Sequence, residues 1–193
     1  MRFLMIVCLL PLLAGCLAAQ NQPSVNVKKD LFHGREWNIA ILDLEYQPIV
    51  GKHQDALVVA VSADANAGRT IASLLANEMS GLDNVTIVER GQVERVMEEQ
   101  KLQLSGAVSS ASAVQIGEML GADAVIVGEV SDYLNWTSLI GNGTTVSFTI
   151  RMTDVKTGKV VFSSSVSKVE HMVVAFQNAQ NLARQIVSEI AQN

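Results

Sequence analysis

The stretch TVSFTIRMTDVKTGKVVFSSSVSKV, residues 145–169, decides the fold of this chain. In its first half apolar and polar residues alternate, which predicts a strand with one buried side and one side facing solvent. The apolar positions are Val146, Phe148, Ile150 and Met152, and the polar positions between them are Ser147, Thr149, Arg151 and Thr153. Lys156-Thr157-Gly158 predicts a tight turn, and residues 159–169 predict a second strand. The chain therefore contains an antiparallel hairpin with one face turned toward a core.

Three segments upstream predict further strands. Trp37–Leu44 and Ala124–Val130 are apolar on both faces, which is typical of central strands. Val85–Val88 is a shorter apolar segment. Helical periodicity recurs around these segments, over residues 64–79, 92–103, 112–120 and 173–190. The predicted order is β-α-β-α-α-β-β-β-α, which indicates a single mixed α/β domain with helices flanking a mixed sheet.

The last predicted helix has the clearest amphipathic pattern in the chain. Its apolar residues form one stripe from Phe176 to Ile190. A stripe of that length would expose a large apolar patch if the helix were detached. We therefore expect this helix to be part of the core.

The segment Tyr46–Ala60 is a long connection after the first central strand. It contains Pro48, Gly51 and a polar, charged patch, and long ordered loops are more often functional than short ones. Within it, Leu57–Val61 is compatible with a short edge strand or with the lead into a helix, and the sequence does not decide between the two.

The first sixteen residues predict export and lipidation. Arg2 precedes an apolar run from Phe3 to Leu13, which is shorter than the roughly 20 residues of a membrane-spanning helix and is typical of a secretory signal. The run ends in Leu13-Ala14-Gly15-Cys16, which resembles the cleavage box of bacterial lipoproteins, in which the cysteine is acylated and becomes the N-terminus. Leu17 follows instead of Asp, and by resemblance to lipoprotein sorting rules this favours the outer membrane.

These features predict three parts of the chain. Residues 1–15 are expected to be the signal peptide, residues 16–36 a lipidated N-terminus with a flexible tether, and residues 37–193 a periplasmic domain. The tether is polar and aperiodic, and about 20 residues reach at most roughly 70 Å.

Composition excludes several classes of function. Cleavage before Cys16 removes 15 of the 193 residues and leaves 178, with 13 basic and 19 acidic side chains and a net charge of −6. No basic cluster is present, which argues against a nucleic-acid partner. Cys8 leaves with the signal and Cys16 takes lipid, so the mature domain has no thiol for a disulfide, a thiolate metal site or nucleophilic catalysis.

No catalytic set emerges from the remaining polar residues. His33, His53 and His171 are isolated in the sequence, and a solvated or hydrogen-bonded histidine is far commoner than a metal ligand. Asp43 and Glu45 read as charges at the end of a strand rather than as an acid and base pair. We therefore predict no enzyme activity, no metal and no cofactor.

A series of short motifs, in order along the chain, resembles one family of proteins. The motifs are Thr86–Arg90, Val93–Gln100, Leu104–Gly106, Ile116–Asp123, Val127–Val130 and Asp154–Val160. Together they resemble the CsgG family, lipoproteins related to the curli secretion channel, and the resemblance runs from about Trp37 to the C-terminus. It implies the fold more firmly than an activity, since each motif also has a structural role, such as the helix stop and turn at Gly121-Ala122-Asp123.

The sequence departs from the channel of that family at three places. The channel inserts two amphipathic hairpins into this domain, and each membrane strand needs about 9–11 alternating residues. Here Asn135–Gly143 is predicted to be only a loop, and Glu170–Met172 leads directly into the last helix. The loop that would match the channel's aromatic-lined constriction has Tyr46 as its only aromatic residue. We therefore expect the soluble domain of the family without the pore.

Three functions remain open. The first is an assembly or secretion accessory that self-associates or docks onto envelope proteins through a sheet edge and the Tyr46–Ala60 loop, with Tyr46, Lys52, His53 and Asp55 as candidate docking residues. The second is a regulator of a peptidoglycan synthase, because activators of penicillin-binding proteins such as LpoB resemble the same domain on a longer, proline-rich linker. The third is a ligand-binding protein. The short tether favours the first.

Overall fold

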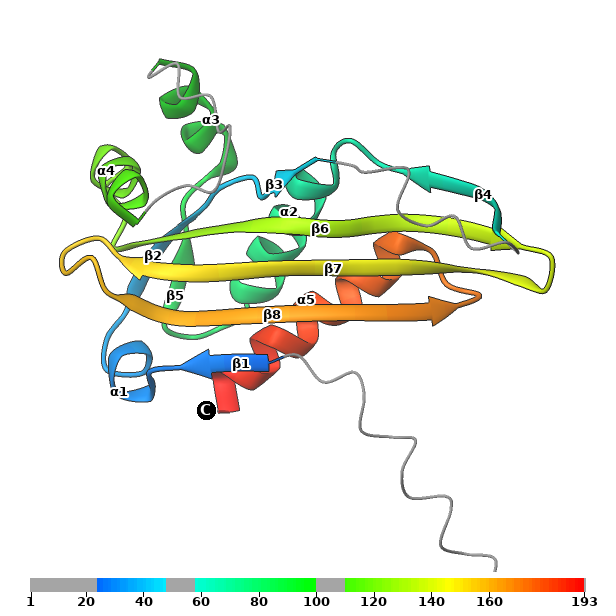
Figure 1. Cartoon of the computed structure of the whole chain (residues 1–193). Helices are drawn as coiled ribbons and strands as arrows, with labels where there is room; N and C mark the ends of the chain where they lie inside the picture. Colours follow the sequence, from blue (N-terminus) through cyan, green and yellow to red (C-terminus); the bar gives the residue numbers. More distant parts are fainter. Residues whose placement is uncertain (1–23, 48–57, 100–109, 193) are drawn as a thin grey trace, which may run out of the picture.

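The computed structural model describes residues 24–47, 58–99 and 110–192 (Figure 1). Within these residues eight strands form one mixed sheet, with helices on both of its faces. The elements are β1 (Ser24–Val27), α1 (Lys29–Phe32), β2 (Trp37–Ile41), β3 (Glu45–Tyr46), β4 (Val58–Ala63), α2 (Ala67–Met79), β5 (Val85–Ile87), α3 (Arg90–Glu99), α4 (Ser110–Leu120), β6 (Ala124–Ser138), β7 (Gly141–Asp154), β8 (Val160–His171) and α5 (Ala175–Gln192). All nine predicted elements are present in the predicted order, which confirms the mixed α/β domain.

The sheet is built around the long strand β6. The main path is β1-β8-β7-β6-β2-β5, in which β2 runs parallel to both β5 and β6, while β6, β7, β8 and β1 are antiparallel neighbours. One side of β6 pairs along its whole length with β7. The other side pairs in turn with β2, β3 and β4, so that three short strands line the same edge.

The main core lies between the sheet and the helices α2 and α5, which Figure 1 shows together on one face. The apolar side of β7 faces this layer, and Val146, Phe148, Ile150 and Met152 are at most 3% exposed. The predicted alternation is therefore confirmed. The stripe of α5 packs on the same core, with Leu182 and Ile186 fully enclosed. Phe176 is an exception to the predicted stripe, because it is half exposed near the start of α5.

A second core covers only part of the opposite face. Helices α3 and α4 pack there on β2 and on the beginning of β6, around Ala40, Leu42, Val125 and Val127. This explains why β2 and the first part of β6 are apolar on both faces, since each face of these segments has its own helical layer. On this face α4 also contacts β7, and none of the residues of the second core lies on β8 or β1.

The structure corrects the predicted boundary between tether and domain. Strand β1 pairs with β8 in antiparallel register, with Val27 opposite Phe162, and the buried Phe32 stacks on Trp37, whose indole nitrogen donates to the Phe32 carbonyl oxygen at 2.8 Å. Residues 24–36 therefore belong to the folded domain. Their polar composition did not indicate a strand, because a short edge strand needs few apolar residues to pair with an existing sheet.

The structure also corrects the predicted loop at Asn135–Gly143. Strands β6 and β7 continue through this segment, with Trp136 opposite Gly143, and only Leu139 and Ile140 form the turn. A Cβ atom on Gly143 would lie 2.4 Å from the Glu170 carbonyl oxygen and 2.6 Å from the Trp136 ring. Gly143 thus permits a close approach of strands, whereas its sequence signal resembled that of a turn.

The undecided segment at 57–61 is an edge strand in the structure. Strand β4 pairs antiparallel with the last part of β6, with a bulge between Val58 and Ala60. Strand β3 places Tyr46 opposite Val130 of β6. Both ends of the predicted docking loop are therefore fixed along one edge of the sheet.

Candidate functional site

The predicted site residues are only partly within the described chain. Tyr46 lies in β3, where it is partly buried and packs against the main core. Lys52, His53 and Asp55 lie outside the described residues, as does Cys16. The structure therefore shows where the loop leaves and rejoins the sheet, and it shows that Tyr46 belongs to the packed strand before it.

Tyr46 is close to a second tyrosine and two carboxylates. Burial, followed by the charges of Asp132 and Asp64, raises the pKa of the Tyr46 phenol above its usual value. Burial, with a smaller contribution from Asp64, raises the pKa of Tyr133 to about 12. Both phenols therefore stay neutral at physiological pH.

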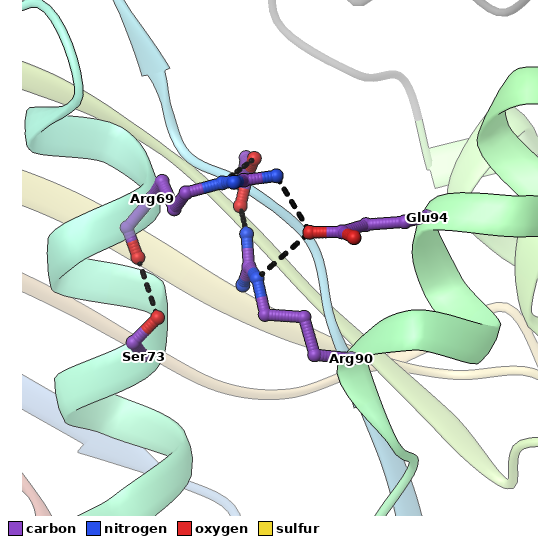
Figure 2. A network of polar contacts seen from close by, with 5 residues as sticks. Arg69, Ser73, Arg90 and Glu94 are labelled. Atoms are coloured by element: carbon purple, nitrogen blue, oxygen red, sulfur yellow. Dashed lines mark hydrogen bonds and ion pairs between the residues drawn. The ribbon is translucent and has the colours of Figure 1, made fainter.

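A network of charged side chains lies beyond the carboxyl end of β2 (Figure 2). Asp43 follows β2, Arg69 is on α2, and Arg90 and Glu94 are one turn apart on α3. Glu94 Oε1 lies 2.5 Å from Arg69 Nη2 and 3.4 Å from Arg90 Nε. Asp43 accepts a hydrogen bond from Arg90 and forms an ion pair with Arg69 Nε at 3.5 Å. The network thus joins a helix from each face of the sheet.

The charges of this network balance within it. Two guanidinium groups face two carboxylates, and the four side chains are 32–55% exposed. Exposed ion pairs contribute at most about 1 kcal/mol each, and arginines already engaged by carboxylates offer little to an anionic ligand. The network fits the interpretation of Asp43 as a charge at the end of a strand. The positions of Arg69 and Arg90 were not predicted, since nothing in the sequence links residues so far apart.

Close packing of α2 on the chain after β2 positions Arg69. A Cβ atom on Gly68 would lie 1.8 Å from the Leu44 carbonyl oxygen, and the Leu44 amide donates to the Gly68 carbonyl oxygen at 3.3 Å. Only glycine permits this approach. Ser73 then donates to the Arg69 carbonyl oxygen at 2.9 Å, one turn along the helix.

A polar surface lies on the face of the sheet opposite the main core. We call it the hydroxyl face, and it consists of residues that lie opposite one another on β1, β7 and β8. These residues are Ser24, Asn26, Ser147, Thr149, Arg151, Ser163, Ser165 and Ser167. Thr149 and Ser165 are directly opposite and both exposed. Ser147 donates to Asp132 at 2.6 Å. A hollow of about 340 Å³ lies over this face, with Glu129 of β6 on its lining.

In the described ranges no three His, Cys, Asp or Glu side chains lie close enough together to hold a metal ion. The serines of the hydroxyl face stand on a flat strand surface, without the sharp strand-to-helix turn of a nucleophile elbow. None of the helices that the structure describes has the length and hydropathy to span a membrane.

Comparison with protein families decides the relationship. The family described as curli production assembly/transport component CsgG matches residues 38–183. The chain belongs to the CsgG family. The match covers most of the chain and confirms the resemblance that the sequence motifs indicated. A comparison with curated proteins gives no significant match.

Solved structures share the CsgG-type fold at low sequence identity. PelC from Paraburkholderia phytofirmans, crystallised as a dodecamer, is 16% identical, with 89% of this chain and 97% of PelC covered and a TM-score of 0.56. The lipoprotein GNA1162 from Neisseria meningitidis is 19% identical, with 81% and 99% covered and a TM-score of 0.54. The LpoB C-terminal domain from Salmonella enterica is 13% identical, with 69% and 84% covered and a TM-score of 0.44. At these identities the likeness to PelC and GNA1162 concerns the fold alone.

Proposed function

We propose that this CsgG-family chain is a lipid-anchored accessory of the bacterial envelope that acts as a scaffold through protein contacts, not as an enzyme and not as a channel. The observation that carries the proposal is the hydroxyl face. A mixed sheet normally has both faces covered where it is apolar and leaves a face open where it is polar. Here the open face is built from short hydroxyl side chains on long, rigid strands.

The composition of the hydroxyl face suits a protein partner. Serine and threonine side chains leave a flat surface and can each donate and accept hydrogen bonds, while Arg151 and Glu129 at the hollow add one charge of each sign. A partner can therefore be another copy of the chain or a different envelope protein. The dodecameric state of the PelC crystals supports self-association as one form of this contact.

The loop between β3 and β4 is the second proposed contact. Its two ends are the strands β3 and β4, which pair with one side of β6, and its sequence offers Lys52, His53 and Asp55. Tyr46, which precedes the loop, contributes by holding its first end to the core. Both proposed contacts are then on the part of the domain built around β6 and β7.

The proposed anchor at Cys16 keeps the domain close to its membrane. Because β1 begins at Ser24, only seven residues separate Cys16 from the sheet, and they reach at most about 25 Å. The alternative function is regulation of a peptidoglycan synthase, as by LpoB. A long linker that can cross the cell-wall mesh would favour that function. The short separation therefore supports a role at the membrane, and we propose the outer membrane, with the domain on the periplasmic side.

Site-specific photo-crosslinking in living cells tests this proposal. A photoreactive residue is placed at Thr149 on the hydroxyl face, at Lys52 in the loop, or at Ser188, an exposed position on α5 that serves as the control. We expect discrete protein adducts from Thr149 and Lys52 and much weaker ones from Ser188. Adducts that are absent from both test positions, or equal at all three, would contradict contact through these surfaces.

A further inference from the structure

One end of the sheet, which we call the apolar tip, carries most of the exposed apolar side chains. The structure describes nine large apolar residues with exposed side chains, and seven of them lie where β4, β6, β7, β8 and the start of α5 meet. They are Val59, Leu139, Ile140, Val169, Met172, Val174 and Phe176. The most exposed are Leu139 at 72%, Ile140 at 86% and Met172 at 87%. Such clustering indicates a contact surface rather than scattered surface residues.

The apolar tip is an ordered part of the fold. Its turn, Leu139-Ile140, is closed by the Ser138 hydroxyl, which donates to the Gly141 carbonyl oxygen at 2.9 Å. The Met172 amide donates to the Asn142 carbonyl oxygen at 3.0 Å, which fixes the end of β8 to the turn. These bonds hold Leu139, Ile140 and Met172 in solvent although nothing in the described chain covers them.

Met172 also has an unusual backbone conformation. Its φ angle is +59°, and it is the one non-glycine residue with a positive φ angle in the described ranges. The left-handed region costs about 1 kcal/mol or more for a side chain of this kind, and glycine or asparagine would occupy it at lower cost. A fully solvated turn gains nothing from methionine at this position, whereas an apolar contact would.

The hairpin and helix segments of the apolar tip contain no charged residues. Residues 133–150 and 171–183 contain no Lys, Arg, Asp or Glu, and the nearest charges on β8, Lys168 and Glu170, pair with each other. Directly behind the turn the rings of Trp136 and His171 meet edge to face, with centroids 5.3 Å apart. The outermost side chains of the tip are thus apolar, and the amphipathic rings of Trp136 and His171 lie behind them. This order of side chains is found where proteins enter a membrane interface.

The direction of the chain brings the proposed lipid anchor to the same end. Strand β1 runs antiparallel to β8, so its first residue, Ser24, is at the end of β1 that lies in the direction in which β8 runs (Figure 1). Ser24 pairs with Ser165, six residues before His171, which is about 20 Å along the strand. The seven residues between Cys16 and Ser24 reach at most about 25 Å. The anchor and the apolar tip can therefore contact one membrane.

We propose that the apolar tip is a second, shallow membrane contact, in which Leu139, Ile140 and Met172 enter the lipid surface that holds the acylated Cys16. The inference rests on the proposed lipid anchor. One end of the sheet then faces the bilayer. The plane of the hydroxyl face is roughly perpendicular to the plane of the membrane, so this face is open to neighbouring proteins. The occupant is a lipid surface because the hairpin and helix segments of the tip lack the charged residues that rim a typical protein interface, and because the proposed anchor can reach the same membrane.

Depth-dependent fluorescence quenching tests the proposal on the lipidated chain. Ile140→Cys is labelled with an environment-sensitive dye, since lipid occupies Cys16 and leaves no other thiol. Leu31→Cys and Met119→Cys carry the same dye at exposed apolar positions on α1 and α4 as matched controls. The proteins are reconstituted in vesicles of phosphatidylethanolamine and phosphatidylglycerol (3:1) with or without a nitroxide-labelled lipid.

We expect the nitroxide lipid to quench the dye at position 140 at least about twofold more than at positions 31 and 119. Equal quenching at all three positions in proteins that float with the vesicles would overturn the tip contact and leave the anchor intact. Proteins that fail to float would show that the anchor is wrong, and the proposal would fall with it. A spectral change at position 140 that needs no vesicles and grows with protein concentration would assign the tip to a second copy instead.

A second measurement is independent of the anchor. The Cys16→Ser chain without its signal is mixed with the same vesicles, and Leu139→Ser/Ile140→Ser is compared with Leu31→Ser/Met119→Ser. We expect the first pair to lower vesicle partitioning by roughly tenfold or more and the second pair to change it little. Equal partitioning of the two variants would contradict the proposal.

Discussion

Leu182→Ala tests whether α5 is an integral part of the core. Leu182 is 1% exposed and packs in the cluster between α2, α5 and the sheet. Truncation of an enclosed leucine costs about 2–5 kcal/mol, because the lost burial is joined by the cavity left behind. For a domain of this size each kcal/mol lowers Tm by roughly 2–4 °C. A loss of about 3 kcal/mol therefore predicts a Tm lower by about 6–12 °C.

Phe176→Ala is the matched control on the same helix. Phe176 has the larger side chain, but it is 50% exposed, so its truncation is expected to cost only about 1 kcal/mol. Circular dichroism during thermal and urea unfolding of the unlipidated Cys16→Ser chain measures both variants. Equal shifts in the two variants, or a shift below about 2 °C for Leu182→Ala, would refute the packing of α5 on this core.

Four further predictions follow from the sequence and the structure. Cys16→Ser is expected to release the protein from washed membranes, and a variant that stays bound would contradict lipidation at this residue. The reconstituted protein is expected to give no single-channel steps in planar bilayers, because the alternating apolar side chains of β7 face α2 and α5; reproducible steps would show a pore. Lys52→Glu/His53→Ala is expected to leave stability within about 0.5 kcal/mol while weakening envelope crosslinks, and unchanged crosslinks would place the contact elsewhere. The pKa of the Tyr133 phenol is raised to about 12 in the folded protein, so with rising pH the unfolded chain loses the phenol proton before the folded chain does. The free energy of unfolding should therefore decrease as pH rises from about 10 to about 12, and in urea titrations Tyr133→Phe should show a smaller decrease.

Periodicity predicted the parts of the fold in which burial decides the residue type. The alternation from Val146 to Met152 and the stripe of α5 follow directly from one face being packed, and β2 is apolar on both faces because each is covered. The family resemblance rested on such elements and on the turns between them. These features depend on local sequence and are therefore visible in it.

The features that the sequence did not reveal depend on long-range pairing. Strand β1 exists because β8 offers it an edge. The hairpin end was read as a loop because its glycines resemble turn signals, although Gly143 is required by the approach of Trp136 and the chain at Glu170. Arg69 and Arg90 meet Asp43 only after α2 and α3 have packed on opposite faces. The placement of Tyr46 in a strand, rather than in the docking loop, likewise follows from its pairing with β6.

The central claim is that the protein works by protein contact through its hydroxyl face while lipid holds it at the membrane. The most direct test is the native mass of the lipidated protein, extracted from its own membranes in mild detergent, beside that of Thr149→Arg/Ser165→Arg. The wild-type chain is expected to migrate in an assembly heavier than one chain. The variant should migrate as a single chain with an unchanged Tm. A wild-type protein that migrates at the mass of a single chain would contradict the proposed function.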